Sequence, residues 1–177
     1  MHLKRLAAIA LAFALAGCMR GEHEAFAYSS GVHPMYADPA DLVATVDLPE
    51  GLELAPRGLI LEFNGARTDS QEVIAGWYPM VRRGEVYRMR GDDIVALRKL
   101  QRVIRLWRSE APERALARIT LLVKGCPTGA GPDPAAKVRV RLSGDGGTRY
   151  RTIDRNRTAI DVLTTKAGPP GVFGPPC

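Results

Sequence analysis

Short segments in which apolar and polar residues alternate recur along most of the chain, and this period of two constrains the fold more than any other feature. In residues 137–142, KVRVRL, Val138 and Val140 are flanked by cations. Successive side chains of a strand point to opposite faces of a sheet, so such alternation predicts a strand with one buried face. The same pattern, or a short apolar run bounded by glycine or proline, predicts seven more strands, at 42–48, 57–65, 72–81, 84–91, 117–126, 148–153 and 158–163.

Residues 92–109 carry the one convincing helical pattern in the chain. An apolar stripe recurs there at the spacings of one helix face: Leu97, Leu100, Ile104 and Trp107, widened by Val103. Asp92 is expected to cap the N-terminus, because its carboxylate can accept hydrogen bonds from free backbone N–H groups, and Pro112 is expected to stop the helix. Four cations fall mostly on the face opposite the apolar stripe: Arg98, Lys99, Arg102 and Arg105.

Strands on both sides of a single helix favour a mainly β fold of the α+β type. We expect an antiparallel β-sandwich or curled sheet of about eight short strands, with the helix packed against it. A parallel βαβ fold is disfavoured, because the helix interrupts the strands instead of alternating with them. Residues 41–177 are expected to form one globular domain that ends in an extended Pro/Gly-rich tail, AGPPGVFGPPC.

The first seventeen residues have the layout of a bacterial secretory signal peptide. Lys4 and Arg5 precede about eleven apolar residues, too few to span a bilayer core, which needs roughly 20. The next residues, Leu15-Ala16-Gly17-Cys18, resemble the lipobox of bacterial lipoproteins. The resemblance implies that residues 1–17 are removed and that Cys18 carries acyl chains such as palmitate, which anchor the protein in a membrane.

The residue after the lipobox cysteine helps to sort lipoproteins between membranes, and an aspartate there commonly retains them in the inner membrane. Met19 occupies this position, so the outer membrane, with the protein facing the periplasm, is expected rather than the inner membrane. Residues 18–40 mix charges with Gly, Ser and Pro and have little periodicity, which predicts a flexible tether. The rest of the chain resembles no family.

Two cysteines remain once Cys18 is assigned to lipid. Exported chains enter an oxidising compartment, where leftover cysteines usually pair, so Cys126 and Cys177 are expected to form a disulfide bond. Such a bond would hold the C-terminus against the body of the domain.

Charge is unevenly distributed along the chain, whose formal net charge is +6. Residues 18–81 hold three arginines and ten acids, a net of −7, whereas residues 82–118 and 119–177 carry +6 and +5. Either the two parts neutralise each other across the fold, or a basic face binds an anionic lipid or an acidic protein. Nucleic acid is not expected outside the cytoplasm. The candidate face comprises Arg98, Lys99, Arg102, Arg105, Arg139 and Arg141.

Common catalytic motifs are missing from the sequence. The chain has no histidine from residue 42 onward, and no HExxH, Walker, GxSxG or CxxC pattern. The usual nucleophile–base pairs therefore lack a base. We expect a non-enzymatic envelope lipoprotein that binds or scaffolds another envelope component and needs no cofactor.

Two other functions stay open. No metal site is predicted, but a periplasmic carrier of a metal or small ligand could use His23, His33 and Met35 of the tether, because imidazole and thioether groups suit copper. An enzyme that uses carboxylates alone could draw on side chains such as Glu62, Glu72 and Asp161.

Overall fold

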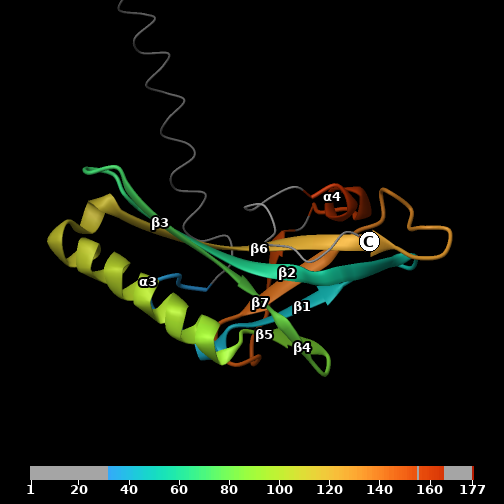
Figure 1. Cartoon of the computed structure of the whole chain (residues 1–177), viewed down its shortest axis with the longest axis horizontal. Helices are drawn as coiled ribbons and strands as arrows, with labels where there is room; N and C mark the ends of the chain where they lie inside the picture. Colours follow the sequence, from blue (N-terminus) through green and yellow to red (C-terminus); the bar gives the residue numbers. More distant parts are fainter. Residues whose placement is uncertain (1–31, 155, 166–176) are drawn as a thin grey trace, which may run out of the picture.

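Two antiparallel β-sheets and one long helix make up the described part of the chain, which comprises residues 32–154, 156–165 and 177 of a computed structural model (Figure 1). The prediction of a mainly β fold of about eight strands with one long helix is confirmed. The three-stranded sheet has the order β3-β2-β6 and the five-stranded sheet the order β4-β5-β1-β7-β8.

The three-stranded sheet contains the longest strands of the fold. It consists of β2 (Leu52–Arg67), β3 (Glu72–Pro79) and β6 (Ala115–Pro127). Its central strand places Phe63 opposite Ile119 of β6 and Gly76 of β3. Phe63 and Ile119 are both buried, so this face of the sheet, the inner face, covers the core.

The five-stranded sheet and the long helix share the inner face of the three-stranded sheet. In Figure 1 the small sheet lies below one half of the long sheet, and α3 (Gly91–Glu110) lies below the other half. Alternation in residues 137–142 works as predicted, since Val140 and Leu142 are buried and Arg139 is exposed. The small sheet comprises β4 (Val81–Arg83), β5 (Val86–Arg88), β1 (Val43–Asp47), β7 (Arg139–Ser143) and β8 (Arg151–Asp154).

Helix α3 contacts all three strands of the long sheet. It buries Leu97, Ile104 and Trp107 of the predicted apolar stripe. The close approach depends on Gly65 of β2, because a Cβ atom there would overlap the side chain of Ile104. The helix begins earlier than predicted: its N-cap is Arg90, and Asp92 lies in the first turn, where its charge faces the positive end of the helix dipole.

The strand predicted at 158–163 is wrong, because this segment forms the short helix α4 (Ala159–Leu163). Thr158 and Asp161 form a capping box, in which each satisfies a backbone N–H at the helix start. Ala159 and Val162 are both buried, a spacing of three that fits a helix face better than a strand. Helix α4 packs against β6.

The predicted flexible tether is wrong for its last nine residues. Val32 and Met35 are buried, and a short 3-10 helix, η1 (Pro39–Asp41), precedes β1. Residues 32–40 therefore belong to the packed body of the domain. Residues 18–31, the signal segment 1–17 and Cys18 lie outside the described residues.

Cys126, near the end of β6, and Cys177 lie at the distance of a disulfide pair, with 5.5 Å between their Cα atoms. Residues 166–176 of the predicted extended tail lie outside the described residues. Within the described part of the chain, no helix is both long and apolar enough to cross a membrane.

Candidate functional site

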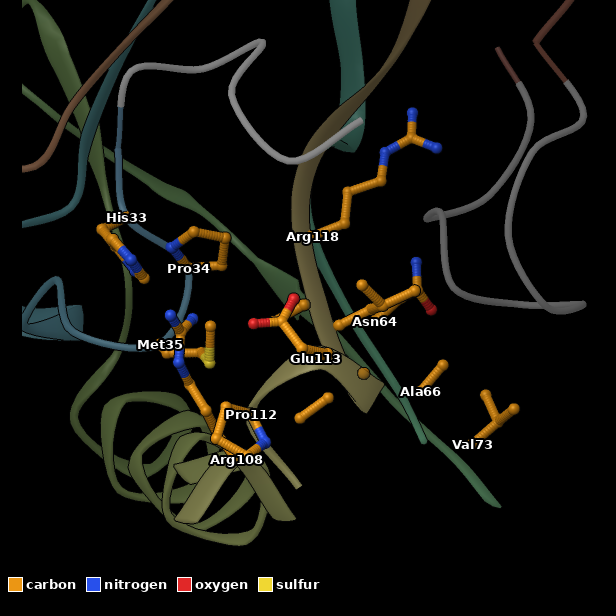
Figure 2. Close-up of a pocket in the computed structure, with 14 residues that line it drawn as sticks. His33, Pro34, Met35, Asn64, Ala66, Val73, Arg108, Pro112, Glu113 and Arg118 are labelled. Atoms are coloured by element: carbon orange, nitrogen blue, oxygen red, sulfur yellow. The ribbon is translucent and has the colours of Figure 1, made fainter. Parts of the chain in front are cut away.

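A pocket of about 490 Å³ follows the beginning of β6, at the side of the three-stranded sheet (Figure 2). Among the described strands β6 pairs with β2 alone, so its other side is a sheet edge. Figure 2 shows the strand running through the pocket, with residues 33–35 on one side of it and side chains of β2 and β3 on the other. The C-terminal end of α3 and the following 3-10 helix, η2 (Pro112–Arg114), close one end.

The hydrogen bonds between β6 and β2 show which residues of β6 point their backbone N–H and C=O groups outward. The amide N–H of Thr68 donates to the carbonyl oxygen of Arg114 at 2.9 Å, so the even-numbered residues of β6 bond to β2. The odd-numbered residues then point their N–H and C=O groups outward. Leu121 agrees, because its carbonyl oxygen accepts a 3.2 Å hydrogen bond from Arg157 Nη1 on the outer side.

Three residues of the edge carry outward backbone groups along the start of the strand: Ala115, Ala117 and Ile119. Within the described part of the chain, none of these groups bonds to another strand. An edge of this kind is a ready template for an added strand.

The pocket walls are mainly apolar and come from two distant parts of the sequence. On one side lie Pro34 and Met35, both buried. On the other side lie Ala66 and Val73, which are cross-strand neighbours on the outer face of the three-stranded sheet. Val73 is 69% exposed and adds apolar surface to this side of the pocket.

Charge in the pocket is mainly positive. Arg108 of α3 and Arg118 of β6 both line it, against a single described carboxylate, Glu113. Desolvation, followed by the positive charge of Arg108, lowers the pKa of His33 from its ordinary value of 6.5. The His33 ring also lies 4.6 Å from that of Tyr36. A negatively charged ligand group would therefore be favoured here.

The wall at residues 34–37 is held in place by α3. Gln101 is buried within the helix face, and its Nε2 donates to the carbonyl oxygens of Pro34 and Ala37, each at 2.9 Å. Arg105 Nη1 adds a 2.7 Å hydrogen bond to the carbonyl oxygen of Met35. These donors explain why a segment with no sequence periodicity has a fixed course.

The predicted basic face is not one free surface. Arg98 forms an ion pair with Asp38 at 2.8 Å, and Arg105 binds the backbone of Met35. Lys99 and Arg102 are exposed on α3. Neutralisation across the fold, the first of the two arrangements, thus applies in part, because Asp38 belongs to the acidic part of the sequence.

The two strand arginines of that prediction lie on β7, an element that faces the other half of the long sheet. Arg141 forms an ion pair with Asp47 of β1 at 3.1 Å and lies 6.0 Å from the centre of the Tyr150 ring. Arg139 is exposed and is paired in register with Asp47. Acidic and basic residues alternate here between neighbouring strands, which relieves the repulsion expected for a row of cations.

Two of the three candidate metal ligands lie in the described part of the chain. His33 and Met35 lie in the pocket wall, whereas His23 lies outside the described residues. Among residues 32–154, 156–165 and 177, no group of three or more His, Cys, Asp or Glu side chains could hold a metal ion.

The candidate carboxylates serve three separate local structures. Glu62 accepts a 3.0 Å hydrogen bond from the indole N–H of Trp77, and Glu72 accepts one from Ser70 at 2.7 Å. Asp161 caps α4. The structure does not bring these three side chains to the pocket described above.

The sequence did not predict that β6 is an edge strand, because the residues of a strand do not determine its position in the sheet. The alternation in residues 117–126 predicts a strand equally well at an edge or in the centre. Val73 was the one available signal, as an exposed branched residue in a strand.

No protein-family model matches the chain, and comparisons with curated proteins and with solved structures find no match.

Proposed function

We propose that this protein is a lipid-anchored envelope protein that binds an extended segment of a partner protein, which adds to the three-stranded sheet at the edge of β6. The observation that carries the proposal is the row of outward backbone groups of Ala115, Ala117 and Ile119, the first two of which line a mainly apolar pocket. Strand addition of this kind is a common mode of peptide recognition, in which backbone hydrogen bonds supply affinity and side-chain pockets supply specificity.

Backbone pairing alone would contribute substantially to the affinity for an added strand. Each of the three outward residues offers one donor and one acceptor, so up to six hydrogen bonds can form. A backbone hydrogen bond contributes a net of about 0.5–1.5 kcal/mol once exchange with water is counted. Alternate side chains of the added strand would lie beside Leu116 and Arg118, the residues of β6 that line the pocket on the outer face of the sheet, and Leu116 supplies apolar surface there.

The charges of the pocket favour a partner segment with acidic side chains. Arg108 lines the pocket, and its positive charge contributes to the lowered pKa of His33 in the same wall. Complementary charge of this kind increases the rate of association and sets the register more than it increases affinity.

The lipid anchor rests on the residues Leu15-Ala16-Gly17-Cys18. Attachment at Cys18 would place the domain at a membrane of the envelope, the outer membrane in preference to the inner one because of Met19. Mass spectrometry of the mature N-terminus tests this directly: we expect an N-terminal cysteine bearing acyl chains, and Cys18→Ser should release the protein from the membrane fraction. An N-terminus without acyl chains would refute the anchor and leave strand addition untouched.

Strand addition is tested by Ala117→Pro, which removes one outward N–H without removing a hydrogen bond to β2. Proline is tolerated on edge strands with this orientation. A photo-crosslinking residue placed at Arg118 of β6 in native envelopes should capture a partner in the parent chain and lose it with Ala117→Pro, while the melting temperature stays close to that of the parent. Leu116→Pro is the matched comparison, because it removes an N–H that bonds to β2 and should lower the melting temperature.

Exchange of amide hydrogens gives the second measurement. The partner should slow exchange at Ala115, Ala117 and Ile119, since these N–H groups become bonded. If crosslinking at Arg118 persists in a folded Ala117→Pro protein, the pocket binds its ligand by side chains and not by strand addition, and the proposal is wrong.

A further inference from the structure

The face of α3 that points away from the sheets carries exposed apolar and basic side chains together. Leu106 and Val95 are 57% and 51% exposed, and Val103 is 37% exposed. Lys99 and Arg102 lie between them and are also exposed. These five residues form one stripe, because spacings of three, four, seven and eight return to the same side of a helix.

The stripe is separate from the pocket of β6. At about 100° per residue, Leu106 and Arg108 lie on nearly opposite sides of the helix, and Arg108 is the α3 residue that lines the pocket. A ligand of the stripe would therefore leave the pocket accessible.

We propose that this stripe of α3 lies against the anionic headgroups of the membrane that holds the lipid anchor. Exposed apolar side chains with cations beside them suit a membrane surface, because the apolar groups can enter the interface while the cations bind anionic headgroups. Arg98, beside the stripe, is paired with Asp38, so Lys99 and Arg102 supply the charge that lipid phosphates would bind. Asp92, in the first turn of the helix, adds a negative charge near the N-terminal end of this face.

The chain joins the domain beside α3, which limits the distance between this helix and the anchor. Residues 34–38 are bonded to Gln101, Arg105 and Arg98 of the helix, so the polypeptide joins the domain beside α3. Cys18 precedes Val32 by 32 − 18 = 14 residues. A fully extended chain of that length spans at most about 50 Å, which limits how far α3 can lie from the bilayer. This step rests on the proposed anchor at Cys18.

Lysine labelling on vesicles tests the orientation. The full-length product is purified from membranes of an expressing bacterium, with whatever modification Cys18 has received, and is reconstituted into vesicles of phosphatidylcholine alone or mixed with phosphatidylglycerol. An amine-reactive reagent then labels Lys99 and Lys137, and mass spectrometry measures both rates. Lys137, exposed just before β7, serves as the internal reference.

We expect labelling of Lys99 to slow by about fivefold or more in the anionic vesicles, since one cation near such a surface gains about a factor of five in binding. Labelling of Lys137 should stay unchanged, and high salt should reverse the effect at Lys99. Equal rates at Lys99 in both vesicle types would overturn the inference. Protection that appears without vesicles and increases with protein concentration would assign the stripe to a second copy of the chain, which also overturns it.

A pair of matched variants adds a control for charge and hydrophobicity. Arg102→Glu with Leu106→Asp should abolish the protection of Lys99. Arg83→Glu with Ile160→Asp removes one exposed cation and one exposed apolar residue elsewhere and should preserve it. The N-terminal mass of each sample separates the two proposals: an unmodified Cys18 refutes the anchor, whereas unprotected Lys99 in an acylated protein refutes only the docking of α3.

Discussion

Arg105 donates a hydrogen bond from Nη1 to the backbone carbonyl oxygen of Met35 at 2.7 Å, across 70 positions of sequence. Gln101, one turn away on the same helix, donates to the carbonyl oxygens of Pro34 and Ala37. Together the two side chains bind residues 34–37 to a polar side of α3. The same residues form one wall of the β6 pocket, so contacts within the fold position the candidate site.

Gln101→Ala should destabilise the protein. Its amide is 2% exposed and serves two carbonyl groups, and leaving a buried polar group unpaired costs about 1–3 kcal/mol. Thermal unfolding measures the loss, and amide exchange at Tyr36 and Ala37 should accelerate. Arg102→Ala, one residue along the helix and exposed, should change stability by no more than about 0.5 kcal/mol. Equal effects of the two variants would show that Gln101 does not hold this segment.

Gly65→Ala should lower stability by about 1–3 kcal/mol, the usual range for overpacking a core. The added methyl group would overlap Ile104, so Ile104→Val should recover part of the loss in the double variant. Chemical denaturation of the four proteins of this cycle gives the coupling energy. Gly91→Ala is the comparison, because nothing lies within 4 Å of a Cβ there and the substitution should be neutral or stabilising. Additive effects of Gly65→Ala and Ile104→Val would contradict the contact.

His33 should make stability depend on pH in the weakly acidic range. Its pKa in the folded protein is lower than 6.5, so the unfolded chain binds the proton more readily. As far as His33 is concerned, the free energy of unfolding is highest above the unfolded pKa of about 6.5. It decreases as the pH falls from there to the folded pKa, because protons bind the unfolded chain more tightly. Unfolding measured against pH should show this decrease, and His33→Gln should remove it.

NMR titration of the His33 ring distinguishes the two causes of that shift. Arg108→Gln should raise the pKa of His33 only in part, because desolvation is the larger cause and remains. Full recovery to the ordinary value would mean that the charge of Arg108 dominates.

Replacing Cys126 and Cys177 by serine should lower the free energy of unfolding by up to about 4 kcal/mol, the chain-entropy value for closing a loop of this length. The bond spans a sequence separation of 51 residues. A thiol assay on denatured protein without reductant should detect neither cysteine. A full equivalent of thiol from either position would contradict the bond.

The strands and the helix were predictable because each has a local period that its own residues display. Residues 137–142 alternate in the structure as they do in the sequence, and the apolar stripe of 92–109 is the buried face of α3. Segment 158–163 was misread because Ile160 and Val162 also alternate, and a capping box at Thr158 outweighs that pattern over a single turn.

The candidate site depends on contacts that no local pattern records. Residues 34–37 have no period of their own, and their place is set by Gln101 and Arg105, more than 60 positions later. The grouping of Arg98 with Arg139 was wrong for the same reason: helix and strand periods assign each residue to a face of its own element, whereas tertiary packing decides whether two faces meet.

The attachment of residues 34–38 to α3 has a mechanical consequence. Any tension transmitted along the chain from an N-terminal anchor enters the domain through Gln101, Arg105 and Arg98, whose bonds lie across the helix surface. Such bonds are loaded together, in shear, and not one after another as in peeling. Because residues 34–38 precede β1 in the chain, the load would reach the helix before it reaches the strands of the small sheet.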